Sequence, residues 1–271
     1  MVDTPTPPPI SRTSPPPGSI RKVTNWLARY WVQALGLVLG AMAWEIAGRA
    51  GISPALPPIS AVIAAGNELW SSERFIESVR TTATSILIGL PPSILIGVFL
   101  GLLMGLLPPV EWFFRPYVNA SLSLPLVAII PIILLIFGLS QTTIVVVIVL
   151  YVLPVVMVNT FAGVRSTDRD LLDMARSYNA HRRLVIRRII LPSSRALTLA
   201  GIRIGVGRAI TGGIVAEQVI GVLGVGGLVQ RLGGAFAVEA LYAVILFIGA
   251  VGVVSLAFIN RIEQRYQIKE T

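Results

Sequence analysis

The chain has 271 residues, of which 54% are hydrophobic and 13% charged, and its mean hydropathy is +0.79. A soluble domain is typically about 45–50% apolar and about 25% charged, so this composition excludes a disordered chain and argues against a soluble one. The sequence contains no cysteine, which excludes disulfides and thiolate-bound metals or clusters. The single histidine, His181, excludes any metal site that needs two histidines from this chain.

Six segments are long and apolar enough to cross a membrane, which takes about 20 residues for a helix. Barrel strands would be about ten residues long with alternating polarity, and residues 143–158 are almost continuously apolar instead. The sequence therefore predicts an all-α, polytopic membrane protein with about six transmembrane helices. The predicted spans are 30–48, 85–107, 117–139, 142–164, 196–219 and 241–260.

The net charge of +9 is distributed unevenly between the segments that connect the spans. If the N-terminus is cytoplasmic, sixteen Lys and Arg residues fall on the cytoplasmic side and four (Arg49, Arg74, Arg80 and Arg231) outside. Cytoplasmic loops of membrane proteins carry the excess of Lys and Arg, so we expect both termini to be cytoplasmic. The positive net charge then reflects the orientation of the spans in the membrane, and no nucleic-acid partner is predicted.

Composition also divides the chain into segments. Seven prolines within the first 20 residues predict a disordered, proline-rich cytoplasmic tail over residues 1–24. Residues 25–75 are predicted to hold the first span and an external segment, and residues 76–262 the transmembrane core. That core contains a basic interior loop, 165–195, and residues 263–271 form a cytoplasmic C-terminal tail.

Small residues recur at four-residue spacing within three spans, and such spacing lets helix backbones approach closely in lipid. The pattern fits helix packing within one subunit, with a dimer seam as the alternative. These residues are Gly36 and Gly40, Gly97, Gly101 and Gly105, and Gly201 and Gly205.

Polar residues near prolines mark a candidate translocation pathway. Pro125 and Pro131 interrupt the third span, and broken helices line polar cavities in membrane proteins. Asn119, Ser121 and Ser123 lie just before this break, so the third span is the candidate pathway wall, with ordinary packing of a kinked helix as the alternative.

Charged residues inside a span are costly and are functional candidates. Arg203, Arg208 and Glu217 lie in the fifth span and complete the predicted pathway set. Arg208 and Glu217 are nine residues apart, about 13 Å along a helix, so they cannot pair directly with each other. Each needs a partner on another helix or a wet cavity, and structural pairing is as compatible with the pattern as contact with a substrate. Glu45 lies near the outer end of its span, within reach of water.

The interior loop has the pattern of a helical hairpin. Thr167 and Asp170 resemble a capping box, and Leu171, Met174, Ala175 and Tyr178 then follow the spacing of an amphipathic helix. Asn179 suits a left-handed helix end. A second helix is expected to begin near His181 and to end at Pro192. The hairpin is either a docking knob that faces the cytoplasm or a basic hairpin on anionic lipid.

The same loop resembles the EAA loop of permease subunits of ABC importers. The family pattern is Glu-Ala-Ala-x-x-x-Gly, nine residues, then Ile-x-Leu-Pro. Residues 173–179 stand at the first part, and the sequence after nine further residues ends Ile189-Ile190-Leu191-Pro192. Flanking segments at residues 56–62, 159–165, 201–209 and 216–217 are similar to the nitrate/sulfonate/taurine branch of these permeases, so the resemblance covers about residues 55–262.

The resemblance implies a type I ABC importer permease fold in the bacterial inner membrane, with the loop acting as the coupling helix. The residues implied to contact the ATPase are Leu172, Asp173, Met174, Ala175, Arg176, Tyr178, Asn179 and Pro192. Asp173, Met174 and Asn179 depart from the family's Glu, Ala and Gly. We expect Asn179 to preserve the turn, whereas Met174 adds bulk at the partner surface.

The resemblance also implies the partners: two cytoplasmic ATPase subunits, a second and identical permease subunit, and an extracytoplasmic substrate-binding protein. The chain has no phosphate-binding Gly-x-x-x-x-Gly-Lys-[Ser/Thr] motif. We therefore expect it to bind no cofactor, and ATP and Mg²⁺ to be bound by the partner ATPase.

The function implied is import of a small anionic solute such as a sulfonate, nitrate or carboxylate. The alternatives are import of a non-anionic metabolite and a membrane anchor or scaffold without transport. An intramembrane enzyme is disfavoured because the spans show no Gly-x-Ser-x-Gly motif, no histidine pair and no carboxylate pair at catalytic spacing. No catalytic residue and no metal ligand is predicted.

Overall fold

A computed structural model describes residues 19–267, and within that range the protein is helical without β-strands. The predicted tails, 1–24 and 263–271, fall largely or partly outside the described residues, and the first helix starts at Ser19. The elements in chain order are α1 (Ser19–Arg49), α2 (Ile59–Trp70), α3 (Glu73–Leu106), α4 (Pro108–Ser123), η1 (Leu126–Ile129), α5 (Ile130–Phe137), α6 (Gln141–Arg165), α7 (Arg169–Ser177), α8 (Arg182–Val185), η2 (Ile186–Ile190), α9 (Leu191–Ile220), α10 (Gly224–Gly234) and α11 (Val238–Gln267).

Five helical segments among the described residues have the length and composition to span a membrane, and a bent pair of helices brings the total to six. The all-α, multi-span prediction is therefore confirmed. The third predicted span, 117–139, is interrupted, as its prolines predict: α4 ends at Ser123, and the pair formed by 108–123 and 126–137 is bent by 96°. Pro125 precedes η1 and Pro131 lies in the first turn of α5, where its missing N–H is tolerated.

The chain divides into two compact units, residues 1–60 and 61–271. Within the first unit, α1 meets the start of α2 through polar contacts. The Glu45 carboxylate accepts hydrogen bonds from the Ser60 backbone N–H at 3.0 Å and from the Ser60 hydroxyl at 2.8 Å, and it pairs with Arg49. The Trp44 indole N–H donates to the Pro57 carbonyl at 3.0 Å. Glu45 therefore has defined partners rather than only the solvent expected from its position.

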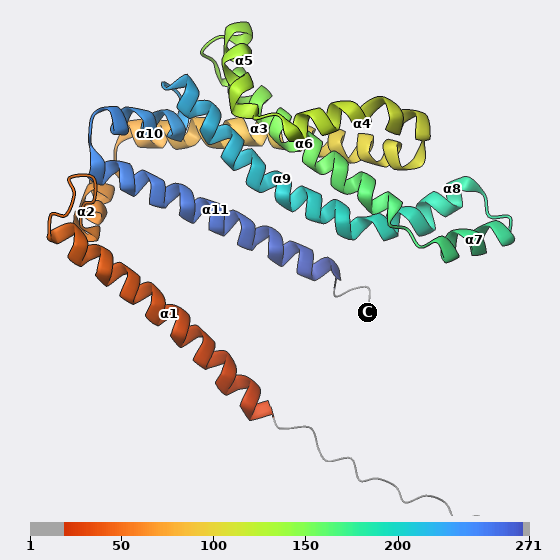
Figure 1. Cartoon of the computed structure of the whole chain (residues 1–271), viewed down its shortest axis with the longest axis horizontal. Coiled ribbons are helices and arrows are strands. Elements are labelled where there is room, and N and C mark those ends of the chain that lie inside the picture. Colours follow the sequence, from red (N-terminus) through yellow and green to blue (C-terminus); the bar gives the residue numbers. More distant parts are fainter. Residues whose placement is uncertain (1–18, 268–271) are drawn as a thin grey trace, which may run out of the picture. The chain divides into compact units, whose positions relative to one another are not determined.

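In the second unit, α6 lies between α3 and α9 and forms the centre of the core (Figure 1). More than half of its most apolar stretch is buried, a larger share than in the other candidate spans. Branched side chains cover both of its packed faces. The fully buried aliphatic ones are Ile144, Val147, Ile148, Val152 and Val156.

Glycines on α3 and α9 allow these two helices to approach α6 closely. A Cβ atom at Gly101 of α3 would lie 2.5 Å from the Met157 carbonyl oxygen of α6. A Cβ atom at Gly201 of α9 would lie 2.5 Å from the Asn159 Cβ. The two glycine patterns on α3 and α9 therefore serve packing within one subunit, whereas Gly36 and Gly40 of α1 face open space.

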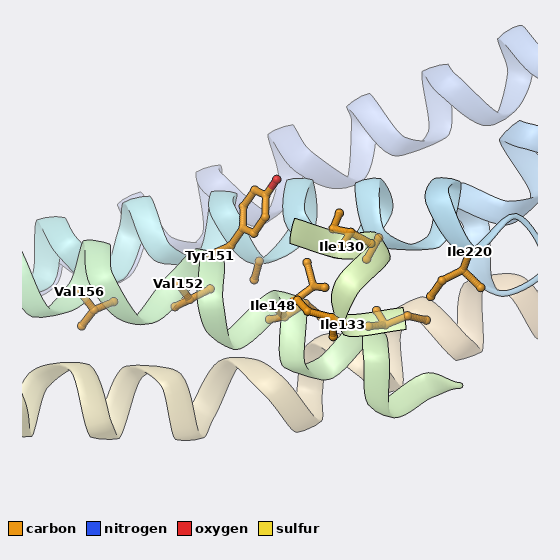
Figure 2. Packing of buried hydrophobic residues seen from close by; sticks show 11 residues of the cluster. Ile130, Ile133, Ile148, Tyr151, Val152, Val156 and Ile220 are labelled. Carbon is orange, nitrogen blue, oxygen red and sulfur yellow. The ribbon is translucent and has the colours of Figure 1, made fainter. Parts of the chain in front are cut away.

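The core cluster extends from α6 to the short helix α5 and the end of α9. Ile130 and Ile133 of α5 join Ile148 of α6 in one buried group, which Ile220 of α9 completes. Figure 2 shows these side chains around α6, with Tyr151 directed towards α9. The ring of Tyr151 is so close to α9 that a Cβ at Gly212 would lie 2.7 Å from its Cγ. The bent α4–α5 pair is thus anchored to the core through α5.

Gly101→Ala is expected to destabilise the protein by about 1–3 kcal/mol, because the added methyl group meets backbone and cannot be relieved by a rotamer change. Gly249→Ala on α11 is the matched control, since no atom lies within 4 Å of the position that its methyl group would take and alanine favours a helix. Thermal unfolding of the detergent-solubilised protein measures both. Equal melting temperatures for the two variants would contradict the packing account.

Candidate functional site

The predicted loop, 165–195, forms a short helix, a tight turn and a second helical segment. Helix α7 ends in a Schellman motif, in which the Ala180 N–H bonds the Ala175 carbonyl and the Asn179 N–H bonds the Arg176 carbonyl, both at 2.9 Å. Asn179 has φ of +50°, the left-handed conformation predicted for it. The family's glycine position is therefore filled here by a residue that tolerates this geometry better than most.

Two details of the loop differ from the sequence prediction. The N-cap of α7 is Asp168, whose carboxylate accepts from the Asp170 N–H, while the Thr167 hydroxyl bonds back to the Val164 carbonyl. Pro192 does not end the second helix, because the backbone continues from Arg182 through the π-turn η2 into α9. A proline has no N–H and crowds the carbonyl four residues earlier, and the wider π-turn accommodates both effects.

Helix α7 presents an apolar face that no described part of the chain covers. Met174 is 51% exposed and Tyr178 is 82% exposed, and Leu171 lies on the same side. Ala175 is instead 6% exposed and packs inward. Asp173 and Arg176 pair with each other at 2.9 Å on the opposite, exposed side. The predicted apolar stripe is therefore split, with the alanine facing the protein and the larger side chains facing outwards.

Both halves of the loop are attached to the corner between α3 and α4. Arg165, the last residue of α6, pairs with the carboxylate of Glu111 in the first turn of α4. Arg182 donates to the Leu106 carbonyl at the end of α3, at 3.3 Å. Sequence reasoning did not single out Glu111 or Arg165. A lone carboxylate at a span boundary, facing a loop rich in arginine, was the available signal.

A pocket of about 240 Å³ lies at the break between α4 and α5. Arg208 of α9 and Ser121 of α4 line it together with Tyr151 and Pro154 of α6. Arg208 is exposed, and it forms no ion pair with any described residue. The pocket therefore places one cationic group and hydroxyl groups beside a helix break, an arrangement suited to an anionic or polar guest.

The six predicted pathway residues do not form one site. Ser121 and Arg208 meet at the pocket, whereas Asn119 and Ser123 are exposed on α4 outside its lining. Arg203 is half-buried on α9 and does not line this pocket either. Tyr151 was missed, although it is a polar-tipped residue in an otherwise aliphatic helix.

Glu217 is fully buried and lies at a junction of α3, α9 and α10. Its carboxylate accepts from the Thr82 hydroxyl at 2.7 Å and from the Gly226 backbone N–H at 2.9 Å. Thr82 also accepts from the Val225 N–H at 2.9 Å. Glu217 and Thr82 thus satisfy backbone N–H groups at the start of α10, which a helix leaves without internal partners.

The junction tolerates no side chain at Gly224. This residue has φ of +66°, and a Cβ there would overlap the Glu217 carboxylate. The partners of Glu217 are therefore a hydroxyl and backbone amides of other helices, as required by its separation from Arg208. The hydrogen bonds of Glu217 therefore form a structural junction of three helices rather than the wall of a pocket.

The sequence over residues 93–268 matches the family described as binding-protein-dependent transport system inner membrane component. This match covers more than half of the chain. The chain belongs to this family. It is 32% identical over 220 residues to the formylaminopyrimidine transport permease protein ThiX of Halalkalibacterium halodurans, covering 81% of this chain and 88% of the relative.

Other relatives are named for different solutes. The taurine transport permease protein TauC of Escherichia coli is 29% identical, with 79% of this chain and 80% of the relative covered. The putative aliphatic sulfonates transport permease protein SsuC of Bacillus subtilis is 27% identical, with 90% and 88% covered. Among solved structures, the MetNI methionine ABC transporter has a TM-score of 0.61 at 15% identity, covering 72% of this chain and 98% of that one.

These comparisons confirm the resemblance deduced from the loop. The chain is a multi-pass inner-membrane permease subunit of an ABC importer, and its fold is that of ABC transporter permeases. It is a transport subunit rather than an enzyme, as its relatives are.

Glu217→Ala is expected to destabilise the protein by at least about 3 kcal/mol, because it leaves buried donors without acceptors and opens a cavity. Glu217→Gln retains the shape and an acceptor oxygen and should lose much less. Glu239→Ala, at an exposed glutamate of α11, is the control and should leave stability unchanged. Thermal unfolding in detergent should give the lowest melting temperature for Glu217→Ala, a higher one for Glu217→Gln and the highest for the control. An alanine variant as stable as the control would contradict this structural role of Glu217.

Proposed function

We propose that the chain lies in the membrane with both termini and the coupling loop in the cytoplasm. The support is the sixteen-to-four division of Lys and Arg across the connecting segments. The segments 1–24 and 263–271 are then cytoplasmic tails, and residues 25–75 hold the first span and an external segment. The break between α4 and α5 lies within the core, 76–262.

Helix α7 docks in a groove of a cytoplasmic ABC ATPase, and the exposed face formed by Leu171, Met174 and Tyr178 carries this assignment. An amphipathic helix that inserts its apolar face into a groove is a common recognition mode. Two ATPase subunits bind ATP and Mg²⁺, and their closure shifts the permease between inward-open and outward-open states. A second, identical permease subunit and an external substrate-binding protein complete the importer.

The imported solute is a small anion, and the pocket containing Arg208 is its contact point on this chain. A guanidinium binds sulfonate or carboxylate oxygens through charge-assisted hydrogen bonds. The exposed Arg208 lacks a carboxylate partner among the described residues and faces the pocket with Ser121. Relatives named for taurine and aliphatic sulfonates support this solute class.

A non-anionic heterocycle is the second candidate solute. A relative named for formylaminopyrimidine transport is 32% identical, and one named for riboflavin transport is 34% identical over 46% of this chain. The aromatic ring of Tyr151 at the pocket suits stacking with such a ring. Substitution of Arg208 separates the two candidates.

Met174→Glu is expected to reduce the amount of ATPase that co-purifies with this chain by at least about tenfold, because it places a charge in an apolar contact. Met174 is preferable to Ala175 as a test site, since the latter is buried within the chain. Arg169→Glu, which reverses a charge on the opposite side of α7, is the control and should leave co-purification unchanged. Absence of any ATPase from the wild-type preparation would instead favour a lipid-bound hairpin or a scaffold.

Arg208→Gln is expected to lower uptake of an anionic probe by about tenfold or more, the cost of a charge-assisted hydrogen bond. Arg208→Lys should retain part of the activity, and ATPase co-purification should be normal in both. Transport is measured as uptake into proteoliposomes, with the binding protein isolated from the same cells. The probes are taurine, an alkanesulfonate, nitrate and a formylaminopyrimidine. If only the pyrimidine is taken up, and Arg208→Gln leaves its uptake unchanged, the transported solute is the heterocycle.

A further inference from the structure

The structure contains a second buried carboxylate, Glu111, with no role in the pathway or in ATPase docking. It lies in the first turn of α4 and is only 5% exposed. The neighbouring side chains of α4 are open, with Trp112 75% exposed and Phe113 60% exposed. A single acidic residue thus lies inside the protein beside aromatic side chains that face outwards, on the same helix that buries Val118.

Two arginines compensate the buried carboxylate, and they differ in what they connect. Arg115 lies one turn further along α4 and pairs with Glu111 at 3.0 Å, so this pair is internal to one helix. Arg165 closes α6 and pairs with the other carboxylate oxygen, so this pair joins two elements. Its guanidinium also lies over the Phe161 ring, 5.6 Å from the centroid.

Arg165 lies where α6 meets the coupling loop, so the Glu111–Arg165 pair connects this loop to α4. The coupling loop begins at this residue, and the later half of the loop is attached to the same corner through Arg182 and the Leu106 carbonyl. Displacement of the loop therefore acts on the corner between α3 and α4 at two points, the end of α3 and the first turn of α4. Of these, the ion pair is the stronger restraint, because both of its partners are charged, whereas Arg182 donates a 3.3 Å hydrogen bond to a neutral carbonyl.

Helix α4 connects this corner to the candidate pathway. Glu111 and Ser123 are twelve positions apart on this helix, about 18 Å at 1.5 Å per residue. The helix then ends at the break, where Ser121 and Pro125 line the pocket that contains Arg208. One continuous helix thus has the coupling loop at its first turn and the pocket at its last.

We propose that Glu111 is a positioning residue that transmits movement of the coupling loop to α4, and through α4 to the Arg208 pocket, by way of its ion pair with Arg165. This inference rests on the proposed ATPase-driven function. It requires the pair between elements, Glu111–Arg165, and not the pair within α4, Glu111–Arg115. The two arginines therefore form a matched pair of test sites on one carboxylate.

The test uses a single cysteine as a reporter, since the natural sequence contains none. Ser121→Cys places a near-isosteric thiol at the pocket, and its rate of maleimide labelling is measured in the purified permease–ATPase complex. The rate is compared between the nucleotide-free state and the state trapped with MgATP and vanadate. This measurement needs no knowledge of the transported solute.

We expect trapping to change the labelling rate in the otherwise wild-type complex. Arg165→Gln should reduce this change at least about fivefold, the lower end of typical coupling between sites. Arg115→Gln should preserve it, and Arg165→Lys, which restores the charge, should recover most of it. Arg165 is half exposed, so its substitution is compatible with folding, and co-purified ATPase reports assembly of each variant.

The outcomes separate the inference from the function on which it rests. If Arg165→Gln responds like wild type, or if Arg115→Gln loses the response equally, the ion pair is merely structural and the inference is wrong. If the wild-type pocket itself shows no response to trapping, ATP-driven movement at this pocket is wrong and the proposed function fails with it. Loss of ATPase from Arg165→Gln alone would make Arg165 a docking residue instead.

Discussion

The close packing of α6 between α3 and α9 is the constraint on which the other features depend. Lipid supplies little hydrophobic drive for one apolar helix to join another, so association in a membrane relies on van der Waals contact and hydrogen bonds. Glycines on the two outer helices bring their backbones against the branched side chains of α6. The position of α6 then fixes both functional regions, because Tyr151 and Pro154 line the pocket and Arg165 starts the coupling loop.

Two buried glutamates supplement this apolar packing with different chemistry. Glu217 is satisfied by a hydroxyl and a backbone amide, and it joins three helices without a counter-charge among the described residues. Glu111 is satisfied by two arginines whose side chains are half exposed. The first arrangement is suited to a fixed junction, because its donors are a backbone N–H and the hydroxyl of a short, buried side chain. The second involves long side chains at the protein surface, which can follow a moving loop.

The coupling loop shows how a family feature persists through a changed sequence. Asn179 occupies the left-handed position where the family has glycine, and the Schellman hydrogen bonds are intact. Met174 stands where the family has a small alanine and faces outwards, so it alters the surface that we propose docks the ATPase and leaves the loop's own fold intact. The difference between these two positions is physical: Asn179 is restrained by its left-handed backbone geometry, whereas Met174 is an exposed side chain that the loop's own fold does not restrain.

The sequence by itself determined the helical membrane class, the approximate spans, the helical hairpin of the loop 165–195 and the left-handed turn at Asn179, because these depend on local composition, spacing and conformational preference. The glycine spacing also indicated the close packing of α3 and α9, although Gly36 and Gly40 of α1, which share the spacing, have no atom within 4 Å of the position that a Cβ would take. Only the tertiary structure decided that Ser121 and Arg208 share a pocket, that Glu217 binds Thr82 and α10, and that Glu111 meets Arg165. These pairings join residues far apart in the chain, and a charged residue in a span reveals that it needs a partner but not which one the fold supplies.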